Sequence, residues 1–322
     1  MKAIVYHAYG SADVLKLEDV ETPLVGDDQV LVKVRAASVN PLDWHYMRGR
    51  PYLVRTQAGL LKPKDSRLGV DFAGQVEAVG KTVTEFAPGD EVFGSSSGAF
   101  SEYVSAFEKS LVLKPANVTF AQAAAVPVAA LTALQALRDR GNVQSGQKVL
   151  INGAAGGVGT FAVQIAKSFG ADVTGVCSTR NVAMVRSIGA DQVIDYTEQD
   201  FTKNGQRHDL LIDIVGNHSL SDCRRALTPE GTLVLVGGPD QGRLLGPLTG
   251  LLKVVVVSRF VKQNLLALLA HGSKDDLVLM RDLLEAGKVI PVIDRSYPLS
   301  EVPAAIRYLQ EGHARGKVVI TV

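Results

Sequence analysis

The residues with the clearest chemical potential lie in the segment KVLINGAAGGVGTFAVQIA, residues 148–166. An apolar run, Val149–Ile151, opens it and is typical of a strand buried on both faces of a sheet. Four glycines and then a helical pattern, Phe161–Lys167, follow, and Gly170 ends the pattern. Strand, glycine turn and helix form the phosphate-binding half of a βαβ unit, because glycines let a pyrophosphate approach the free N–H groups of the helix N-terminus. The segment therefore predicts a dinucleotide-binding site.

The fingerprint inside this turn is Ala154-x-Gly156-x-x-Gly159, with alanine where the first glycine usually stands. A fingerprint of this kind is weak by itself, but here the expected strand precedes it and the expected helix follows it. A glycine turn with a purely structural role is the alternative. The cofactor contacts predicted along this turn are Ala155, Gly156, Gly157 and Val158.

The residues after the second predicted strand, Asp172–Cys177, indicate which nicotinamide cofactor is bound. NAD-specific sites place an Asp or Glu at the end of this strand, where its carboxylate binds the ribose 2′-hydroxyl. Here Ser178, Thr179 and Arg180 follow instead, and their hydroxyl and guanidinium donors suit a 2′-phosphate, which a carboxylate would repel. This pattern favours NADPH. The alternatives are that the two hydroxyls only cap the next helix and that Arg180 is a solvated surface charge.

The elements around this site alternate between strands and helices over residues 172–236, which is the pattern of a doubly wound parallel sheet. The predicted elements after the second strand are a helix at Asn181–Ile188 and strands at Gln192–Ile194, Leu210–Val215 and Thr232–Val236. Residues 248–270 are expected to add a last strand and helix. The segment Thr119–Arg138 is helical in pattern with Thr119 as its N-cap, and Pro127 divides it into two helices or kinks it.

The first third of the chain has a different pattern. Residues 1 to about 115 are rich in short strands separated by Gly, Pro and Asp turns, which favours a barrel-like β domain. The predicted strands are Ala3–Tyr6, Val30–Ala36, Gly74–Val79 and Glu91–Phe93. A helix at Asp275–Glu285 and a strand at Lys317–Val322 are expected to return to this domain. We therefore expect an α/β protein with a substrate domain at 1–118, completed by 272–322, and a nucleotide domain at 119–271.

The composition argues against several classes of protein. Of 322 residues, 46% are hydrophobic and 21% are charged, and the formal charge of +1 gives no basis for binding nucleic acid or an anionic membrane. Two cysteines, Cys177 and Cys223, are too few for a disulfide framework or a four-thiolate zinc lobe. No leader is apparent before the first strand, and three basic residues make 248–270 a poor membrane span. We expect a cytoplasmic protein without a membrane span.

The order of β domain, nucleotide domain and returning strand resembles the medium-chain dehydrogenase/reductase superfamily. The motifs that carry the resemblance over essentially the whole chain are AAGGVG with AVQIAK (154–159 and 162–167), AASVNPLD (36–43), APGDEVFG (87–94) and GHARGKVV (312–319). They are similar to the zinc-free quinone oxidoreductase branch, which includes ζ-crystallin, and within it to the reticulon-interacting-protein-like and chloroplast-envelope reductases. The resemblance implies a GroES-like β-rich barrel, a Rossmann nucleotide-binding domain and a homodimer.

The positions that hold the zinc ligands in zinc-dependent relatives carry other residues here. By resemblance, Asn40 replaces a cysteine, and Val70 and Asp71 replace a His-Glu pair, so only the Asp71 carboxylate could act as a ligand. Residues 94–101 also lack the cysteines of a structural zinc lobe. A catalytic zinc needs about three protein ligands, so we expect no metal. Without a Lewis acid to stabilise an alkoxide, an acceptor that is already electrophilic, a quinone or an α,β-unsaturated ketone, suits the site best.

The resemblance also implies residues beside the cofactor and the substrate. Those expected near the cofactor, beyond the residues already given, are Asn40, Thr132, Tyr196, Val215, Gly237, Gly238 and Lys317. Asn40 could instead only form the turn before a proline, and the two glycines could only end a strand. Tyr46 and Tyr52, on a long loop at 47–67 that could cover a cleft or be ordinary surface, are the candidate substrate contacts. His45, at the place of a proton-relay histidine, and Gln263, on the late helix, are weaker candidates.

No Ser-His-Asp order, carboxylate pair or reactive cysteine is apparent, so catalysis is expected to rest on positioning and on exclusion of water. The leading hypothesis is an NADPH-dependent reductase that transfers a hydride to a quinone or to the β-carbon of an enone, whose enolate then takes a proton from water or a tyrosine. One rival is an NADPH-binding protein with a mainly non-catalytic role, as in crystallin or RNA-binding relatives. Another is a zinc-free alcohol or carbonyl oxidoreductase.

Overall fold

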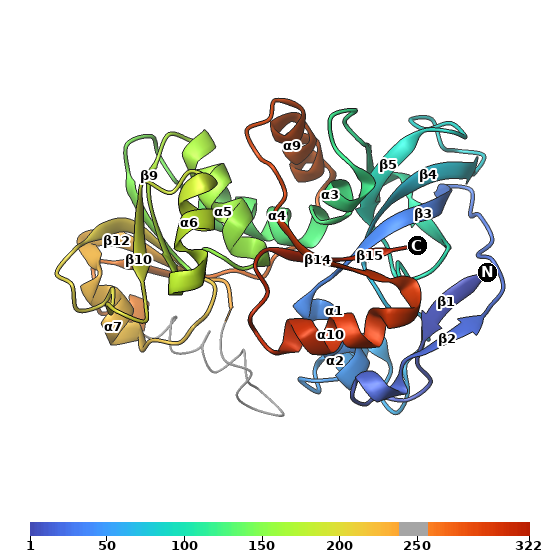
Figure 1. Ribbon diagram of the computed structural model, residues 1–322, viewed down its shortest axis with the longest axis horizontal. Coiled ribbons are helices and arrows are strands. Elements are labelled where there is room, and N and C mark those ends of the chain that lie inside the picture. The colour runs from blue at the N-terminus through green and yellow to red at the C-terminus, as the bar shows by residue number, and fades with distance from the viewer. Residues whose placement is uncertain (238–256) are drawn as a thin grey trace. The chain divides into compact units, whose positions relative to one another are not determined.

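The computed structural model describes residues 1–237 and 257–322 (Figure 1). Two compact units divide the chain: Met1–Leu131 with Gly272–Val322 form the first, and Thr132–His271 form the second. The chain leaves the first unit within helix α4 (Pro127–Gln135) and returns to it just before helix α9 (Lys274–Glu285). The sequence predicts the first domain boundary after residue 118, whereas this division places it after Leu131.

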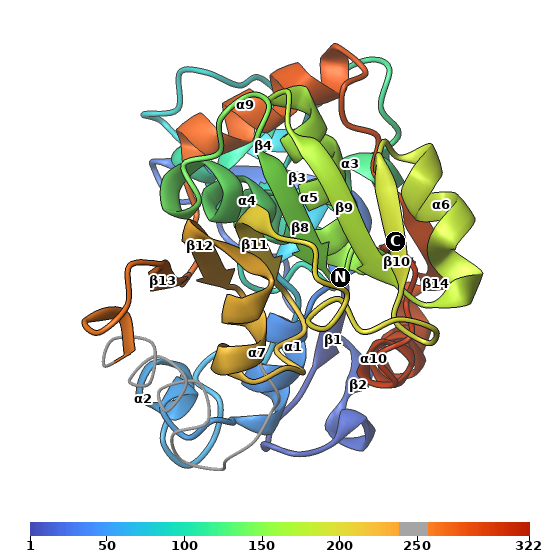
Figure 2. The same cartoon turned by 90° about the vertical axis from the view of Figure 1, so that its left-hand side faces the viewer.

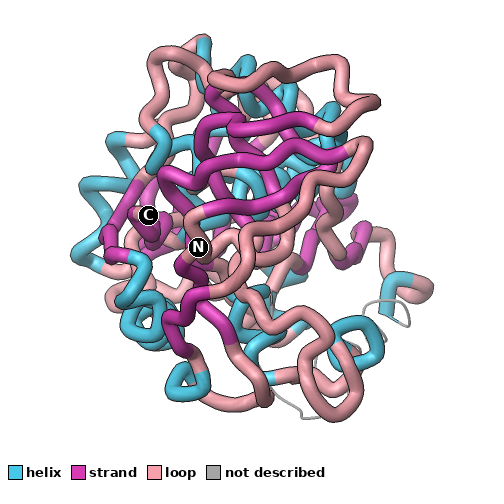
Figure 3. The backbone as a smooth tube through the Cα atoms, turned by 90° about the vertical axis from the view of Figure 1, so that its right-hand side faces the viewer, coloured by secondary structure: helices cyan, strands magenta, loops and turns pink. Residues whose placement is uncertain are grey.

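The first unit is built on a seven-stranded sheet in the order β14-β15-β3-β4-β5-β7, with β6 also paired to β3 (Figure 3). Its strands are β3 (Gln29–Val39), β4 (Asp71–Val79), β5 (Glu91–Ser95), β6 (Tyr103–Phe107), β7 (Leu111–Leu113), β14 (Ile293–Pro298) and β15 (Lys317–Thr321). Strands β14 and β15 are parallel, and the other described pairs are antiparallel. A separate antiparallel pair joins β1 (Lys2–Val5) to β2 (Lys16–Asp19). The predicted return of the last strand to the β domain is therefore present, as the pairing of β15 with β3.

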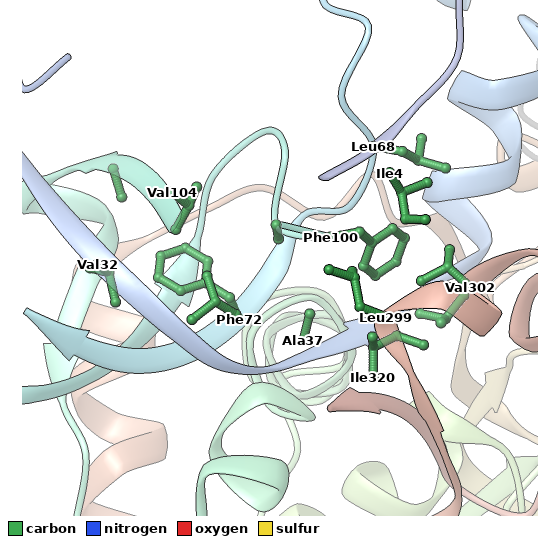
Figure 4. Close-up of a cluster of buried hydrophobic side chains, with 14 of the residues drawn as sticks. Ile4, Val32, Ala37, Leu68, Phe72, Phe100, Val104, Leu299, Val302 and Ile320 are labelled. Atoms are coloured by element: carbon green, nitrogen blue, oxygen red, sulfur yellow. The ribbon is translucent and has the colours of Figure 1, made fainter. Parts of the chain in front are cut away.

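A core of buried apolar side chains lies against this sheet (Figure 4). Phe72 on β4 has no exposed surface and is one of the largest side chains in the core. Helix α10 (Val302–Gln310) adds Val302, Ala305 and Ile306, whose three- and four-residue spacing places them on one face of the helix. Burying one phenylalanine of this kind stabilises the fold by roughly 2 kcal/mol relative to exposing it. Helix α10 lies outside the helices expected from the sequence.

Short helices connect the strands of the first unit. They are α1 (Pro41–Arg48), α2 (Val54–Ala58) and α3 (Phe120–Ala124), followed by the start of α4. Residues 47–67, expected to form one long loop, therefore contain α2 and the end of α1. The guanidinium of Arg55 lies 4.4 Å from the centroid of the Tyr9 ring and donates to the Gly49 carbonyl at 3.0 Å, which holds α2 in place. The predicted division at Pro127 is confirmed, because this proline begins α4 after α3 has ended.

The second unit holds an all-parallel six-stranded sheet in the order β10-β9-β8-β11-β12-β13 (Figure 2). Its strands are β8 (Lys148–Asn152), β9 (Asp172–Cys177), β10 (Gln192–Asp195), β11 (His208–Asp213), β12 (Leu227–Leu235) and β13 (Asn264–Ala267). Among the described residues, its helices include α5 (Gly157–Ser168), α6 (Val182–Ser187) and α7 (Leu220–Arg225), and a π-helical turn at Ala136–Arg140 follows α4. The apolar run of β8 has no exposed surface, as expected for a strand covered on both faces. The doubly wound parallel sheet is confirmed.

Three parts of this unit differ from the sequence prediction. Helix α5 begins at Gly157 rather than Phe161, because the glycine turn leads directly into it. Strand β12 begins at Leu227, and its register against β11 shifts before the predicted start at Thr232. The late strand is present as β13, but part of the predicted strand-and-helix segment, 248–256, lies outside the described residues. No helix among the residues that the structure describes is long and apolar enough to cross a membrane.

Candidate cofactor and substrate sites

The glycine turn lies at the carboxyl edge of the parallel sheet, between β8 and α5. Gly153 has a φ of +94°, and a Cβ at Gly159 would lie 2.0 Å from the Gly153 carbonyl oxygen, so both positions need glycine. A Cβ at Gly156 would meet only that oxygen, at 3.6 Å, so space remains open beside the N-terminus of α5. The first N–H groups of a helix have no partner within it, and this arrangement fits the pyrophosphate of a dinucleotide. The predicted contacts at this turn are Ala155, Gly156, Gly157 and Val158.

The predicted 2′-phosphate contacts follow β9 at the same edge. Thr179 and Arg180 are exposed, whereas Ser178 is half-buried and accepts a hydrogen bond from Asn181 at 3.1 Å. Ser178 makes no capping bond to the turn that it precedes, and the Thr179 hydroxyl lies 2.9 Å from the hydroxyl of Thr197. The structure therefore does not support helix capping as the role of these hydroxyls.

Asp195 brings to this edge a carboxylate that the sequence argument overlooked. It ends β10, opposite Cys177 of β9, and accepts hydrogen bonds from the N–H and hydroxyl of Thr197 at 2.9 and 2.8 Å. The hydroxyl of Thr179, together with these bonds, holds the pKa of Asp195 below its ordinary value. The sequence pattern identifies the end of β9 alone, whereas parallel pairing places the end of β10 beside it. Tyr196, which follows directly, is 57% exposed.

A buried Asn–Asp pair fixes the next loop of the carboxyl edge. Asn152 at the end of β8 donates to Asp213 Oδ1 at 2.8 Å, and the N–H of Gly216 donates to the same oxygen at 2.9 Å. The predicted cofactor contact Val215 lies in this loop and is 44% exposed. The pair therefore holds Val215 at the edge where the glycine turn lies.

Three further predicted cofactor contacts lie at the ends of strands or in a helix. Gly237 follows β12, and a Cβ there would lie 2.1 Å from the Ile214 carbonyl oxygen. Packing of the backbone therefore requires glycine at this position, whether or not a cofactor binds there. Gly238 lies outside the described residues. Thr132 is half-buried in α4.

A buried polar cluster lies in the first unit where β15, β3 and β4 pair. Strand pairing sets Ser38 of β3 opposite Asp71 of β4, and β15 lies on the other side of β3. Asn40 links two charged groups: its Nδ2 donates to Asp71 Oδ2 at 2.8 Å, and its Oδ1 accepts from Lys317 Nζ at 2.5 Å. These three residues are no more than 3% exposed. We call Asn40, Asp71 and Lys317 the Lys317 cluster.

The charges of the Lys317 cluster are neutralised within the protein. Asp71 lies 4.0 Å from Lys317 Nζ, and its further donors, at 3.2–3.4 Å, are Ser38 Oγ, Ser95 Oγ and the Val128 N–H. Burial raises the pKa of Asp71, and Lys317 and Asn40 oppose this effect. Burial lowers the pKa of Lys317, and Asp71 opposes it. We assign Asp71 as ionised because so many donors point to its oxygens, and a carboxylate accepts them all.

Asp43, on the first turn of α1, is a second buried carboxyl and one that the sequence argument did not select. Its Oδ2 accepts the N–H of Asn40 at 2.7 Å, and its buried Oδ1 has no hydrogen-bond partner among the described residues. Burial raises the pKa of Asp43 to about 8, against the lowering effect of that hydrogen bond. Asp43 therefore holds a proton at neutral pH. The sequence feature that points to Asp43 is its position three residues after the N-cap, because an acidic residue there often caps a helix.

A cavity of about 410 Å³ opens in the first unit beside Asp43. Its polar lining includes Tyr6, Tyr46 and Arg67, and its apolar walls include Leu42 and Leu68. The Arg67 guanidinium is fixed by two hydrogen bonds to Asp65, Nε to Oδ1 and Nη2 to Oδ2, each 3.2 Å long. Apolar walls with a few fixed donors suit a small carbonyl compound.

The structure brings one of the two predicted substrate tyrosines to this cavity. Tyr46 lines it from α1, whereas Tyr52 does not and instead lies against Arg55, with 4.9 Å between guanidinium and ring centroid. His45 Nδ1 bonds the Arg50 carbonyl at 2.9 Å, at the end of α1, and is not part of the cavity lining. The assignment of Gln263 to a late helix is wrong, because it directly precedes β13 at the amino edge of the sheet.

The two cysteines are unsuited to nucleophilic chemistry. Burial raises the pKa of Cys177 to about 11, and burial together with Asp213 raises the pKa of Cys223 to about 12. Both thiols therefore stay protonated at neutral pH. Each packs as a small apolar side chain at the sheet.

Comparisons with known proteins cover the whole chain. The family model for the alcohol dehydrogenase GroES-like domain matches residues 26–116, and the model for zinc-binding dehydrogenases matches residues 188–320. The chloroplastic NADPH-dependent alkenal/one oxidoreductase of Arabidopsis thaliana is 36% identical over 99% of this chain and 79% of its own length. The chloroplast envelope quinone oxidoreductase homolog of the same plant is 34% identical over 99% of this chain and 98% of its own. The chain belongs to the medium-chain dehydrogenase/reductase superfamily.

A solved structure supports the same placement within the superfamily. The quinone oxidoreductase from Coxiella burnetii superposes with a TM-score of 0.87 at 34% identity, covering 100% of this chain and 99% of its own. The α/β fold with a GroES-like domain and a Rossmann-like domain is thereby confirmed, as is the similarity to the quinone oxidoreductases.

The Lys317 cluster does not fit a catalytic zinc of the kind that other members of this superfamily hold. The positions expected to ligate zinc carry Asn40, Val70 and Asp71, and Asp71 is already paired with an ammonium and four other donors. Among the described residues, no group of three or more His, Cys, Asp or Glu side chains could hold a metal ion. The side chains at this position therefore suit an internal cation, Lys317, better than a bound one.

Proposed function

We propose that this protein is an NADPH-dependent reductase that transfers a hydride to a quinone or an α,β-unsaturated carbonyl compound without a metal ion. The observation that carries the proposal is that the chain has both an open glycine turn, in the second unit, and a donor-lined apolar cavity, in the first. Relatives of about 35% identity named as an NADPH-dependent alkenal/one oxidoreductase and a quinone oxidoreductase homolog support it.

The second unit holds the dinucleotide in this proposal. The N–H groups at the start of α5 bind the pyrophosphate, and Gly156 leaves room for it. Ser178, Thr179 and Arg180 are the proposed contacts of the 2′-phosphate, and the ionised Asp195 beside them accepts hydrogen bonds from threonine hydroxyls. The other proposed cofactor contacts are Asn40, Thr132, Ala155, Gly157, Val158, Tyr196, Val215, Gly237, Gly238 and Lys317.

The first unit holds the acceptor. NADPH, when bound, supplies the hydride. The apolar walls of the cavity exclude water from the acceptor, and Tyr46 donates a hydrogen bond to the carbonyl oxygen, where negative charge develops. The Lys317 cluster fixes the residues at the start of α1, because Asn40 joins it to the helix that carries Tyr46 and Asp43. Asn40 thus acts as a positioning residue in this proposal.

A steady-state assay tests the proposed activity. Oxidation of NADPH is followed with 1,2-naphthoquinone, 9,10-phenanthrenequinone and 3-buten-2-one, and the same series is run with NADH. We expect turnover with at least one acceptor and a preference for NADPH. Tight NADPH binding without turnover of any acceptor would instead support a non-catalytic binding protein.

The absence of a metal requirement is tested separately. Elemental analysis of the purified protein and activity after chelation are compared. We expect substoichiometric zinc and unchanged turnover, since Lys317 holds the position next to Asp71. Stoichiometric zinc whose removal abolishes turnover would contradict this part of the proposal alone.

We also propose a cytoplasmic homodimer. The support is the resemblance to dimeric relatives and the outer edge of β13, which pairs with no strand among residues 1–237 and 257–322. Sedimentation equilibrium measures the mass directly. A single species of about 34.3 kDa, the mass of one chain, would contradict the dimer.

A further inference from the structure

A second cavity of about 410 Å³ lies in the second unit, remote from the glycine turn. Its lining comes from the residue before β11, from helix α7, from Pro229 of β12 and from the two residues before β13. The polar lining residues are Arg207, Ser221, Arg224, Arg225, Lys262 and Gln263. We call it the amino-edge pocket, because it lies at the amino ends of strands β11 and β13.

The amino-edge pocket is separate from the candidate cofactor site. All six strands of the sheet are parallel, so their amino ends and carboxyl ends form opposite edges. Arg207 precedes β11, whereas Asp213, at its other end, bonds the strand that leads into the glycine turn. A six-residue strand spans roughly 20 Å. A dinucleotide phosphate held by the glycine turn therefore does not occupy this pocket.

The pocket gathers four cationic side chains from three segments of the chain. Among the described residues, one ion pair reaches them, that between Arg225 and Asp222 at 2.5 Å. Lys262 makes no hydrogen bond or ion pair within that part of the chain, and Arg207 bonds the Leu227 carbonyl at 3.3 Å. Four cations and one paired carboxylate, Asp222, leave an excess of positive charge at the pocket, which an anion would relieve.

One of these cations is held in place by a buried side chain. Gln263 is 9% exposed; its Oε1 accepts from Arg224 Nε at 2.8 Å, and its Nε2 donates to the carbonyl oxygens of Arg224 and Thr228 at 2.9 and 3.2 Å. The amide thus fixes the Arg224 guanidinium before any ligand arrives, which lowers the entropic cost of binding. The terminal nitrogens of Arg224 have no partner among the described residues. A solvated surface arginine would not need such a support.

We propose that the amino-edge pocket binds a phosphorylated small molecule. Arginine forks match phosphate oxygens in pairs, and the pocket supplies three arginines, a lysine and the Ser221 hydroxyl. Its volume is in the range of small-ligand sites. The chemistry that it recognises is a di- or trianionic phosphate group on a small carrier.

Calorimetric titration of inorganic pyrophosphate into protein saturated with NADPH tests the proposal, since the cofactor then blocks the glycine turn. We expect one bound pyrophosphate per chain at low ionic strength. Lys262→Gln and Arg224→Gln should each weaken binding about tenfold, the loss of one charge-assisted hydrogen bond. Lys262→Gln keeps the test valid if Arg224→Gln disturbs the fold, because Lys262 bonds no described residue.

Arg186→Gln is the matched control, because Arg186 is an exposed arginine of α6 beside β10, at the opposite side of the sheet. It should change pyrophosphate affinity less than twofold. AMP and adenosine form a second arm: AMP should compete with pyrophosphate and adenosine should not, if phosphate is the group recognised. Absence of binding, binding unchanged by both pocket variants, or an equal loss in Arg186→Gln would overturn the proposal. Pyrophosphate binding is measured without any acceptor, so these outcomes do not depend on whether the proposed reductase activity is correct.

Discussion

The carboxyl edge of the second unit and the Lys317 cluster of the first hold their polar groups in different ways. At the edge, Thr179 and Arg180 are exposed and the space beside Gly156 is open. In the cluster, Asn40 bridges the carboxylate of Asp71 and the ammonium of Lys317, and these residues are no more than 3% exposed. A ligand can reach exposed groups, whereas groups that are buried and paired mainly hold the protein in one arrangement. The main effect of substitutions at the edge should therefore be on cofactor affinity, and the main effect of substitutions in the cluster should be on stability.

The largest effect is expected from Asp71→Asn. This change leaves the Lys317 ammonium buried without a counter-charge and turns two acceptor oxygens into one, so the free energy of unfolding should fall by about 3–5 kcal/mol. Urea denaturation measures it. Combining Asp71→Asn with Lys317→Met removes both charges and should recover part of the loss.

Asp19→Asn is the control for this comparison, because Asp19 forms an exposed ion pair with Lys2 on β1 and β2. It should change stability by less than about 1 kcal/mol. A loss below about 1 kcal/mol for Asp71→Asn as well would show that the cluster is not a stabilising pair. The proposed difference between the carboxyl edge and the Lys317 cluster, in which only the cluster mainly stabilises the fold, would then be wrong.

The next largest effect is expected from Arg180→Gln. A charge-assisted bond to the 2′-phosphate contributes roughly 1.5–3 kcal/mol, so NADPH affinity should fall by about one to two decades. NADH affinity should be unchanged, because NADH lacks that phosphate. Fluorescence titration with both cofactors measures the two effects, and Arg186→Gln on α6 controls for net charge.

An equal loss of NADPH and NADH affinity in Arg180→Gln would mean that this residue serves the fold or the pyrophosphate. Asp195→Asn extends the test in the other direction. It removes a negative charge beside Thr179, so NADPH should bind no less tightly than before. A large loss of NADPH affinity in this variant would show that Asp195 positions the threonines that bind the phosphate.

The same contrast explains how much the sequence could predict. The glycine turn is local: strand, turn and helix follow one another within 21 residues, Lys148–Ser168, so periodicity and glycine spacing identify it. Strand β9 begins and ends where predicted, at Asp172 and Cys177. Only the start of α5 was placed too late, since glycines weaken a helical pattern.

The buried groups of the first unit could not be identified in the same way. Asn40, Asp71 and Lys317 come from segments up to 277 residues apart, and only strand pairing brings them together. The resemblance to known proteins selected Asn40 and Lys317, but no local pattern shows that they bond each other. The proton on Asp43 depends on burial, which a sequence does not give. The same holds for Asp195, whose neighbour is set by the pairing of β10 with β9.

A third prediction concerns pH and separates Asp43 from the Lys317 cluster. The pKa of Asp43 is about 8 in the folded protein against an ordinary value of 3.8, so the folded state binds the extra proton between these values. Its contribution to stability is fully present below about pH 4, decreases by at most about 1.4 kcal/mol per pH unit as pH rises, and is lost above about pH 8. Asp43→Asn mimics the protonated form and should remove this slope.

Urea denaturation of the wild type and Asp43→Asn at pH 6, 7 and 8 measures that difference. The asparagine oxygen can still accept the N–H of Asn40, so the helix cap is kept. As pH rises, the free energy of unfolding of the variant should increase relative to that of the wild type. Parallel pH dependence in the two proteins would show that Asp43 is already ionised when folded.

The smallest effect is expected for Tyr46→Phe, which tests whether the cavity contains an indispensable acid. Removing a true general acid usually costs on the order of 100- to 10,000-fold. For a quinone we expect a loss in kcat/KM of about tenfold or less, because the quinone accepts hydride unaided and protonates afterwards from solvent. The loss should be larger for an enone, since its enolate is more basic and gains more from a hydrogen bond. Tyr52→Phe, outside the cavity lining, is the matched control and should be nearly silent with both acceptors. A loss above about a thousandfold with the quinone, at unchanged NADPH affinity, would make Tyr46 a catalytic acid and would give the first unit a chemical role beyond holding the acceptor.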